Sequence, residues 1–142
     1  MQPSTILESA LYVTDLDAAD TFYSEVLGLE RIAKVAGRHV FFRCGQGVLL
    51  LFVAGATSEP PPSGAKLPVP PHGTLGQGHL CFAATADDIG RWKARLTQKG
   101  VAIEADFEWP PKPGQEPGGR SIYFRDPSGN SLEFAEPKIW NL

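Results

Sequence analysis

The sequence predicts an α+β fold built from two βαβββ modules, and two observations carry that prediction. First, residues 38–55 and 120–137 align without a gap, with identical residues at pairs such as Phe42/Phe124 and Arg43/Arg125. Second, a strand pattern and a helix pattern precede each copy in the same order. An internal repeat of this kind fixes the architecture. We therefore expect two mixed sheets that pair into a partly open barrel around a central cavity.

The first module is expected over about residues 5–55. Residues 6–13 form an apolar run typical of a strand. A helix follows, because apolar residues recur there at helical spacing, at Leu16, Ala19, Tyr23, Val26 and Leu27. The residues that can cap this helix are Asp15 or Asp17 at its start and Gly28 just past its end. The remaining strands are expected over residues 29–36, 39–43 and 48–53.

The second module is expected over about residues 78–137 and repeats this order. Residues 78–84 are typical of a strand. A helical face follows at Ile89, Trp92 and Leu96, with Thr85 or Asp87 as the N-cap and Gly100 at the end. Three more strands are expected near residues 102–109, 120–125 and 131–136.

The two modules are joined by a proline-rich linker over residues 56–77. Its prolines remove backbone donors and stiffen the chain, which favours a linker that can lie over a site. The segment 110–119 is rich in glycine and proline and is either a lid or an ordinary hairpin loop. A chain of 142 residues is expected to form a single domain, residues 1–142.

The composition excludes several classes of function. The net charge of −3 and a pI near 5.6 argue against a partner nucleic acid, which usually requires a basic stripe. No apolar run approaches the length of a membrane span, and the N-terminus lacks the features of a signal peptide. The two cysteines do not make a disulfide framework. We therefore expect a cytoplasmic protein with no nucleic-acid or membrane partner.

Strand alternation brings three ionisable residues to the face opposite the helices, namely Glu8, His79 and Glu133. Glu8 and His79 hold equivalent places in the first strands of the two modules. Glu133 aligns in the repeat with Leu51, where a carboxylate has replaced an apolar residue. One histidine and two carboxylates suit a divalent metal ion. The alternative is that the two carboxylates are solvated and that His79 is an ordinary hydrogen-bonded histidine.

Three segments resemble the vicinal oxygen chelate superfamily, which comprises glyoxalase, bleomycin-resistance and extradiol dioxygenase proteins. They are LYVTDLDAADTFYSEVLGLE at 11–30, GHLCFAA at 78–84 and GGRSIYFRDPSGNSLEF at 118–134. The resemblance implies metal ligands at Glu8, His79 and Glu133. Leu51, at the fourth ligand position, cannot bind a metal, which is closer to three-ligand members. The metal is left open among Zn, Mn, Fe, Ni and Co, and a homodimer is implied.

The same resemblance implies that such an enzyme binds two vicinal oxygens of a small molecule at the metal. Tyr123 and His39 are the catalytic candidates, as a hydrogen-bond donor and as a base. The substrate-binding candidates are Ser121, Phe41, Leu51 and Arg125, although Arg125 also fits a role in bracing a turn. We expect a glyoxalase-like lyase or isomerase, or a dioxygenase. The alternatives are a metal-free protein that binds an antibiotic, and a structural or regulatory module.

Overall fold

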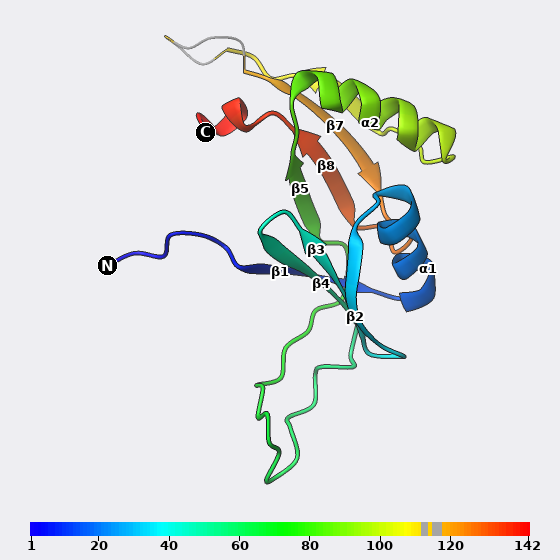
Figure 1. Ribbon diagram of the computed structural model, residues 1–142, viewed down its shortest axis with the longest axis vertical. Coiled ribbons are helices and arrows are strands. Elements are labelled where there is room, and N and C mark those ends of the chain that lie inside the picture. The colour runs from blue at the N-terminus through cyan, green and yellow to red at the C-terminus, as the bar shows by residue number, and fades with distance from the viewer. Residues whose placement is uncertain (112–113, 115–117) are drawn as a thin grey trace. The chain divides into compact units, whose positions relative to one another are not determined.

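The computed structural model describes residues 1–111, 114 and 118–142, and the chain divides into two compact units (Figure 1). The first unit is Met1–Gly78 and the second is His79–Leu142. The boundary between them falls where the second module was expected to begin. The single domain expected over residues 1–142 stays a prediction.

The first unit contains one four-stranded sheet and one helical segment. The strands are β1 (Glu8–Val13), β2 (Glu30–Val35), β3 (His39–Cys44) and β4 (Gly47–Val53). Their order in the sheet is β1-β4-β3-β2, with β1 parallel to β4 and the other pairs antiparallel. The helix α1 (Leu16–Thr21) continues as a π-helical segment, η1 (Phe22–Val26).

The predicted helix cap and helix end of the first unit are confirmed. The side chain of Asp15 accepts a hydrogen bond from the backbone of Ala18 and so caps α1. Gly28 follows the helical segment with a φ of 74°, a conformation that suits glycine. Tyr23 is fully buried and stacks on Phe42 of β3, with ring centroids 5.8 Å apart. The helical segment therefore packs on the face of the sheet that carries Phe42.

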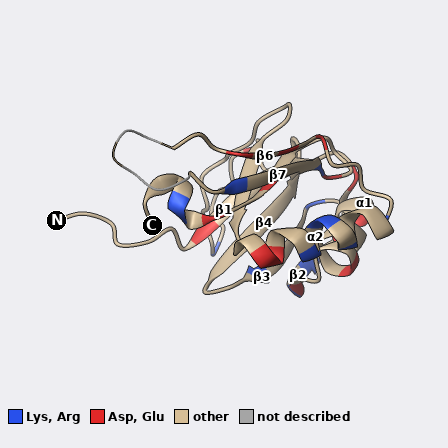
Figure 2. Ribbon diagram, turned by 90° about the horizontal axis from the view of Figure 1, so that it is seen from above, with Lys and Arg blue, Asp and Glu red and all other residues tan. Residues whose placement is uncertain are grey.

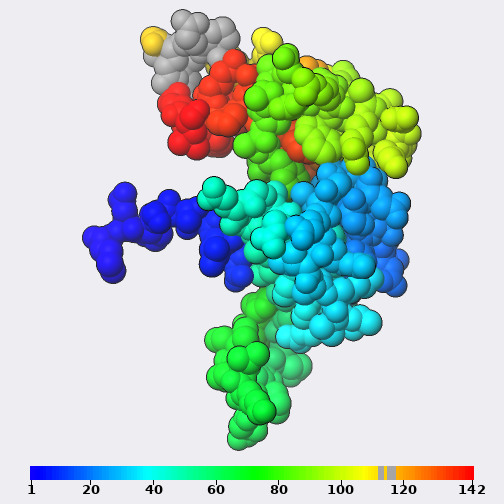
Figure 3. All heavy atoms as spheres, viewed as in Figure 1, coloured from blue at the N-terminus to red at the C-terminus, as the bar shows by residue number. Residues whose placement is uncertain are grey.

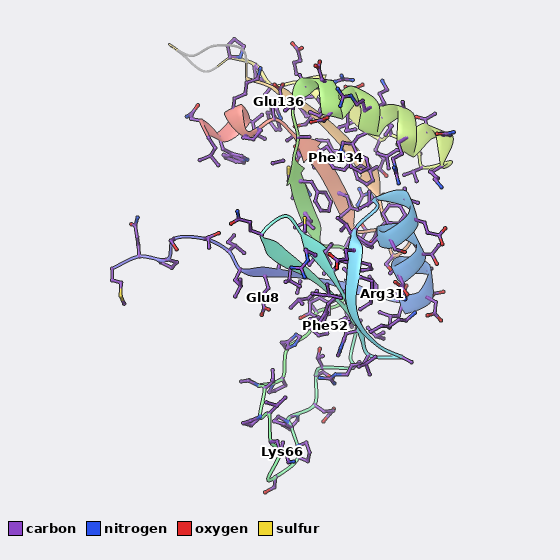
Figure 4. All side chains as sticks on the ribbon, viewed as in Figure 1. Glu8, Arg31, Phe52, Lys66, Phe134 and Glu136 are labelled. Atoms are coloured by element: carbon purple, nitrogen blue, oxygen red, sulfur yellow. The ribbon has the colours of Figure 1, made fainter. Side chains whose placement is uncertain are left out.

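The linker is tied back to the first sheet near both of its ends. The backbone of His72 donates to the carbonyl of Thr57, and the Thr57 hydroxyl donates to the carbonyl of His72, at 2.9 and 2.6 Å. The Oη of Tyr12 lies 2.7 Å from Nδ1 of His72, whose ring also meets Phe52 edge-on. The segment between these anchors projects from the unit, with Lys66 at its far end (Figures 3 and 4).

The second unit repeats the architecture with β5 (His79–Ala83), α2 (Ala86–Gln98), β6 (Ala105–Glu108), β7 (Arg120–Arg125) and β8 (Ser131–Ala135). Its strand order is β5-β8-β7-β6, and a short 3₁₀ helix, η2 (Pro137–Trp140), follows. The side chain of Thr85 caps α2, whose acidic first turn is visible in Figure 2. Trp92 of α2 stacks on Phe134 of β8 with ring centroids 4.5 Å apart, so α2 covers that face of the sheet.

The α+β class and the two βαβββ modules are therefore confirmed. Each sheet is open, with edge strands β1 and β2 in one and β5 and β6 in the other. The strand predicted near residue 102 begins only at Ala105, because the chain first closes the end of α2. There the backbone of Val101 donates to the carbonyl of Leu96. The closing of the two sheets into a partly open barrel stays a prediction.

One sequence expectation is corrected by the strand register. In the first sheet Arg43 pairs with Val48, and in the second Arg125 pairs with Ser131, so the second turn is one residue longer. The gapless alignment of the repeat therefore slips after the turn. A slip of one residue moves every later side chain to the other face of the strand.

The residue equivalent to Glu133 is consequently Leu50 and not Leu51. Leu51 pairs with Val40 of β3 and with Leu11 of β1, and all three side chains are buried. They lie on the face that packs against the helical segment. The expectation that Leu51 contacts the substrate was wrong for this reason.

Candidate functional site

The centre of the candidate site is the contact between His79 at the start of β5 and Glu133 in the middle of β8. Nε2 of His79 lies 3.3 Å from Oε2 of Glu133. The other ring nitrogen, Nδ1, lies 3.1 Å from the carbonyl oxygen of Ser131. Because a carbonyl can only accept, Nδ1 carries a hydrogen, and in the neutral form of the ring Nε2 would present its lone pair toward Glu133.

Two acceptors that face each other leave room for a cation between them. The Glu133 side chain is only 5% exposed, and its Oε1 is buried without a hydrogen-bond partner among the described residues. A buried carboxylate requires a compensating charge. A divalent metal ion bound by both side chains would supply that charge. His79 and Glu133 therefore fit two ligands of a metal ion.

The third expected ligand, Glu8, belongs to the first unit. It begins β1, is exposed, and pairs with Val48 in the sheet register (Figure 4). His79 pairs with Ser131 at the equivalent point of the second sheet, so the predicted equivalence of Glu8 and His79 agrees with the register. Within the described part of the chain, no three His, Cys, Asp or Glu residues are gathered closely enough to hold a metal ion.

Tyr123 of β7 and Cys81 of β5 flank Glu133 in the register of the second sheet. Burial, and then the neighbouring Glu133 carboxylate, raise the pKa of Tyr123 to about 12. The same two causes raise the pKa of Cys81 to about 12. Both groups therefore keep their protons at neutral pH. Tyr123 is suited to donate a hydrogen bond, and Cys81 is not an activated thiolate.

Ser121 of β7 is fully buried, and its Oγ accepts a hydrogen bond from Nε1 of Trp109 at 2.8 Å. The serine oxygen therefore holds the indole of Trp109 in place. The expectation that Ser121 binds the substrate stays a prediction. The bond between Trp109 and Ser121 was not predicted from the sequence.

Phe107 of β6 was missed in the sequence. It pairs with Ser121 in the register and stacks on Tyr123, with ring centroids 5.9 Å apart. Parity carried from Tyr123 to its neighbouring strand would have placed Phe107 on this face. That step needs the register of β6 against β7, which the long segment between these strands hides.

Arg125 of β7 contacts residues near the turn between β7 and β8. Its Nε donates to Glu104 at 2.9 Å, and its Nη1 donates to the carbonyl of Gly129 at 3.0 Å. The guanidinium therefore pairs with a carboxylate and braces the turn between β7 and β8. The bracing role that the sequence also allowed is observed, and a role of Arg125 in substrate binding stays a prediction.

His39 and Phe41 lie on the open face of the first sheet. Their rings stack with centroids 4.1 Å apart, and both rings meet Phe52 edge-on. Nδ1 of His39 is buried without a partner among the described residues. Burial, and then the charge of Arg38, lower the pKa of His39 below its usual value. A neutral imidazole with an unpaired nitrogen is what a general base requires.

Comparisons with known proteins identify the family of this chain and proteins that resemble it. The model of the Glyoxalase/Bleomycin resistance protein/Dioxygenase superfamily matches residues 5–134. The chain is 32% identical over 123 residues to the glutathione transferase FosA of Serratia marcescens, covering 87% of this chain and 74% of that protein.

Solved structures also resemble this chain. A lactoylglutathione lyase from Agrobacterium tumefaciens has a TM-score of 0.88 and 42% identity, with 100% of both chains covered. The fosfomycin resistance protein FosX of Listeria monocytogenes has a TM-score of 0.66 at 18% identity, with 94% of this chain and 91% of that chain covered. At that identity the likeness to FosX concerns the fold alone.

Proposed function

The chain belongs to the Glyoxalase/Bleomycin resistance protein/Dioxygenase superfamily, and from that premise we propose that it is a metal-dependent enzyme acting on a small oxygenated molecule. The observation that carries the proposal is the contact between His79 and Glu133. A histidine whose tautomer is fixed by a backbone carbonyl faces a buried carboxylate with an unpaired oxygen. Both features are typical of metal ligands.

Glu8 is proposed as the third ligand. Its position in the first sheet matches that of His79 in the second, and the side chain is exposed at the start of β1. Leu50, the equivalent of Glu133, provides no fourth ligand. Three protein ligands leave positions open for substrate oxygens.

When bound, the metal would act as a Lewis acid toward two vicinal oxygens of the substrate. The chain's own residues would position the substrate and handle its protons. Tyr123 keeps the proton on Oη and can donate it in a hydrogen bond to an oxygen on which negative charge develops. His39, neutral and with an unpaired Nδ1, is proposed as the base that accepts a proton from the substrate.

The reaction class proposed first is a glyoxalase-like lyase or isomerase reaction on a glutathione-linked substrate. The support comes from two relatives, a lactoylglutathione lyase at 42% identity and a glutathione transferase at 32% identity. A ring-cleaving dioxygenase is proposed second. Non-haem iron oxygenases typically use two histidines and one carboxylate, whereas the proposed ligand set contains one histidine and two carboxylates and favours hard, oxygen-preferring metal ions.

Metal content tests the proposal. The chain is purified without chelators, loaded separately with Mn, Fe, Co, Ni and Zn, and analysed for bound metal. About one metal ion per chain is expected, with a sharp loss in Glu133→Gln and none in the matched control Glu108→Gln. Glu108 is exposed and pairs with Arg120 on β7. Full occupancy in Glu133→Gln would contradict the site.

Activity is then screened on lactoylglutathione, on glutathione with small epoxides, and on catechols. Turnover of the first would support the lyase reaction, and turnover of the last would support the dioxygenase. A second candidate function is metal-free binding of a small molecule such as a cationic antibiotic. It is favoured by the net charge of −3, which suits a cationic ligand. Tight binding of such a compound by chain that takes up none of the metals would support it.

A further inference from the structure

A continuous row of rings crosses the open face of the second sheet. Tyr123 stacks on His79 with ring centroids 6.2 Å apart. Phe107 stacks on the Tyr123 ring at 5.9 Å with an angle of 7° between the planes, and Trp109 meets Phe107 at 5.1 Å. We call His79, Tyr123, Phe107 and Trp109 the aromatic row. It begins at a proposed metal ligand and ends beyond β6.

The strand register places this row on the same face as Glu133. Tyr123 pairs with Glu133, and Phe107 pairs with Ser121, which in turn pairs with Ala135. Paired residues of neighbouring strands point to one face of a sheet. Phe107 and Tyr123 are therefore diagonal neighbours across β6 and β7, and the row is continuous with the proposed metal site.

The outer part of the row is exposed and offers only ring surface. Phe107 and Trp109 are each 39% exposed. The single polar hydrogen of the Trp109 indole is already donated to Ser121. The neighbouring acid Asp106 alternates to the other face, where it pairs with Arg120 and Lys93. A ligand that meets the row would find rings without a competing charge.

We propose that the aromatic row is a subsite for a flat aromatic group of the substrate. This inference rests on the proposed function, because the chelating end of such a substrate would be held at His79 and Glu133. Because the row begins at the proposed ligand His79, one short molecule can place its two oxygens at the metal and its aromatic ring on the row. An aromatic group would gain stacking energy in addition to the burial of apolar surface, whereas an aliphatic group of the same size would gain the burial alone.

Two ligands separate stacking from burial. Mandelate and 2-cyclohexyl-2-hydroxyacetate carry the same hydroxyl and carboxylate and differ only in the aromaticity of the ring. Their affinities are measured by titration calorimetry with Mn-loaded and with metal-free chain. We expect mandelate to bind about fivefold more tightly, which corresponds to about 1 kcal/mol of stacking.

Phe107→Leu should remove this preference, because it keeps an apolar side chain and removes the ring. Trp140→Leu is the matched control, since Trp140 is 70% exposed in η2 and lies outside the row. It should leave the preference unchanged. Ser121→Ala frees the indole without removing a ring and should weaken the preference in part. Circular dichroism confirms that each variant folds.

Equal affinities in the unaltered chain, binding of neither acid, or a preference that survives Phe107→Leu would overturn the subsite. Conversion of a dimer to a monomer by Phe107→Leu, with the preference unchanged, would instead make the row a contact between copies. Metal uptake reports on the proposed function separately. Chain that takes up Mn without preferring mandelate loses the subsite alone. A preference that depends on Phe107, in chain that takes up none of the metals offered, keeps the subsite and removes the metal-dependent function.

Discussion

Leu50 holds the position in the first sheet that Glu133 holds in the second. Leu50 pairs with Ala10 of β1 and Phe41 of β3, and its side chain is half-buried on the open face. Its neighbour Leu51 is fully buried on the opposite face. The difference between these two leucines can be tested directly.

Leu50→Glu should be tolerated and Leu51→Glu should not. A glutamate at position 51 would be an unpaired charge in the core, and we expect a loss of more than about 4 kcal/mol in the free energy of unfolding. At position 50 the carboxylate can reach water, and the expected loss is about 1 kcal/mol. Urea denaturation followed by circular dichroism measures both. Equal losses would show that the register of β4 is wrong.

The physical reason for the slip lies in the two turns. In the second turn the Asp126 carboxylate accepts hydrogen bonds from the backbones of Ser128 and Asn130 and from the Asn130 side chain. This network holds the extra residue. The first turn has Gly45 with a φ of 57° and closes with the pair Cys44 and Gly47. The prediction aligned the two copies by their identical residues and therefore did not detect the difference in turn length.

Periodicity predicted the elements well because each has one buried face and one open face. The order of strands and helices, the caps at Asp15 and Thr85, and the shared face of His79 and Glu133 all follow from it. The hydrogen-bond partners of individual donors and acceptors do not follow from periodicity. Arg125 pairs with Glu104, and Ser121 pairs with Trp109, through contacts that span a long segment of sequence. Such pairings depend on the tertiary register.

Tyr123 should remain protonated over the ordinary pH range. Burial and Glu133 disfavour the phenolate and raise its pKa to about 12, so the neutral donor persists well above pH 10. Absorbance titration of metal-free chain, compared with Tyr123→Phe, isolates this one phenol among the three tyrosines. The two curves should coincide up to about pH 11. A difference that develops near pH 10 would contradict the environment described for Tyr123.

Tyr123→Phe should also lower kcat by about 10- to 100-fold on whichever substrate the screen identifies, because it removes one donor to developing charge. The pH dependence of kcat/KM should keep its shape below about pH 11, since the lost group does not titrate there. Metal content serves as the control and should not change. An unaltered kcat would remove Tyr123 from the chemistry.

Asp106 should make the second unit less stable in acid. Hydrogen bonds from Arg120 and then Lys93 hold the pKa of this carboxyl well below its usual range. The folded chain therefore binds the proton less readily than the unfolded chain. The stabilisation is present above the unfolded pKa of about 4 and is lost as the pH falls below it.

Asp106→Asn should accordingly lower the free energy of unfolding by about 1 kcal/mol at pH 7, a modest figure because the partners are partly exposed. The difference from the unaltered chain should shrink as the pH falls from about 4 toward the lowered pKa of the folded chain. Glu59→Gln, on the exposed linker, is the control and should have no effect at either pH. A difference that stays constant with pH would point to a cause other than this ion pair.

Gly118 permits the close approach of chain that places Trp109. A Cβ at this position would lie 2.7 Å from the carbonyl oxygen of Trp109 and 2.8 Å from that of Pro110, so the backbone would have to move. Gly118→Ala should therefore shift Trp109 away from Ser121, change the tryptophan fluorescence, and cost about 1–3 kcal/mol of stability. Gly90→Ala is the matched control. A Cβ there meets nothing within 4 Å on α2, and alanine should stabilise the helix by about 0.5–1 kcal/mol. If both variants are stabilised and the fluorescence is unchanged, the contact between Gly118 and Trp109 does not hold the indole in place.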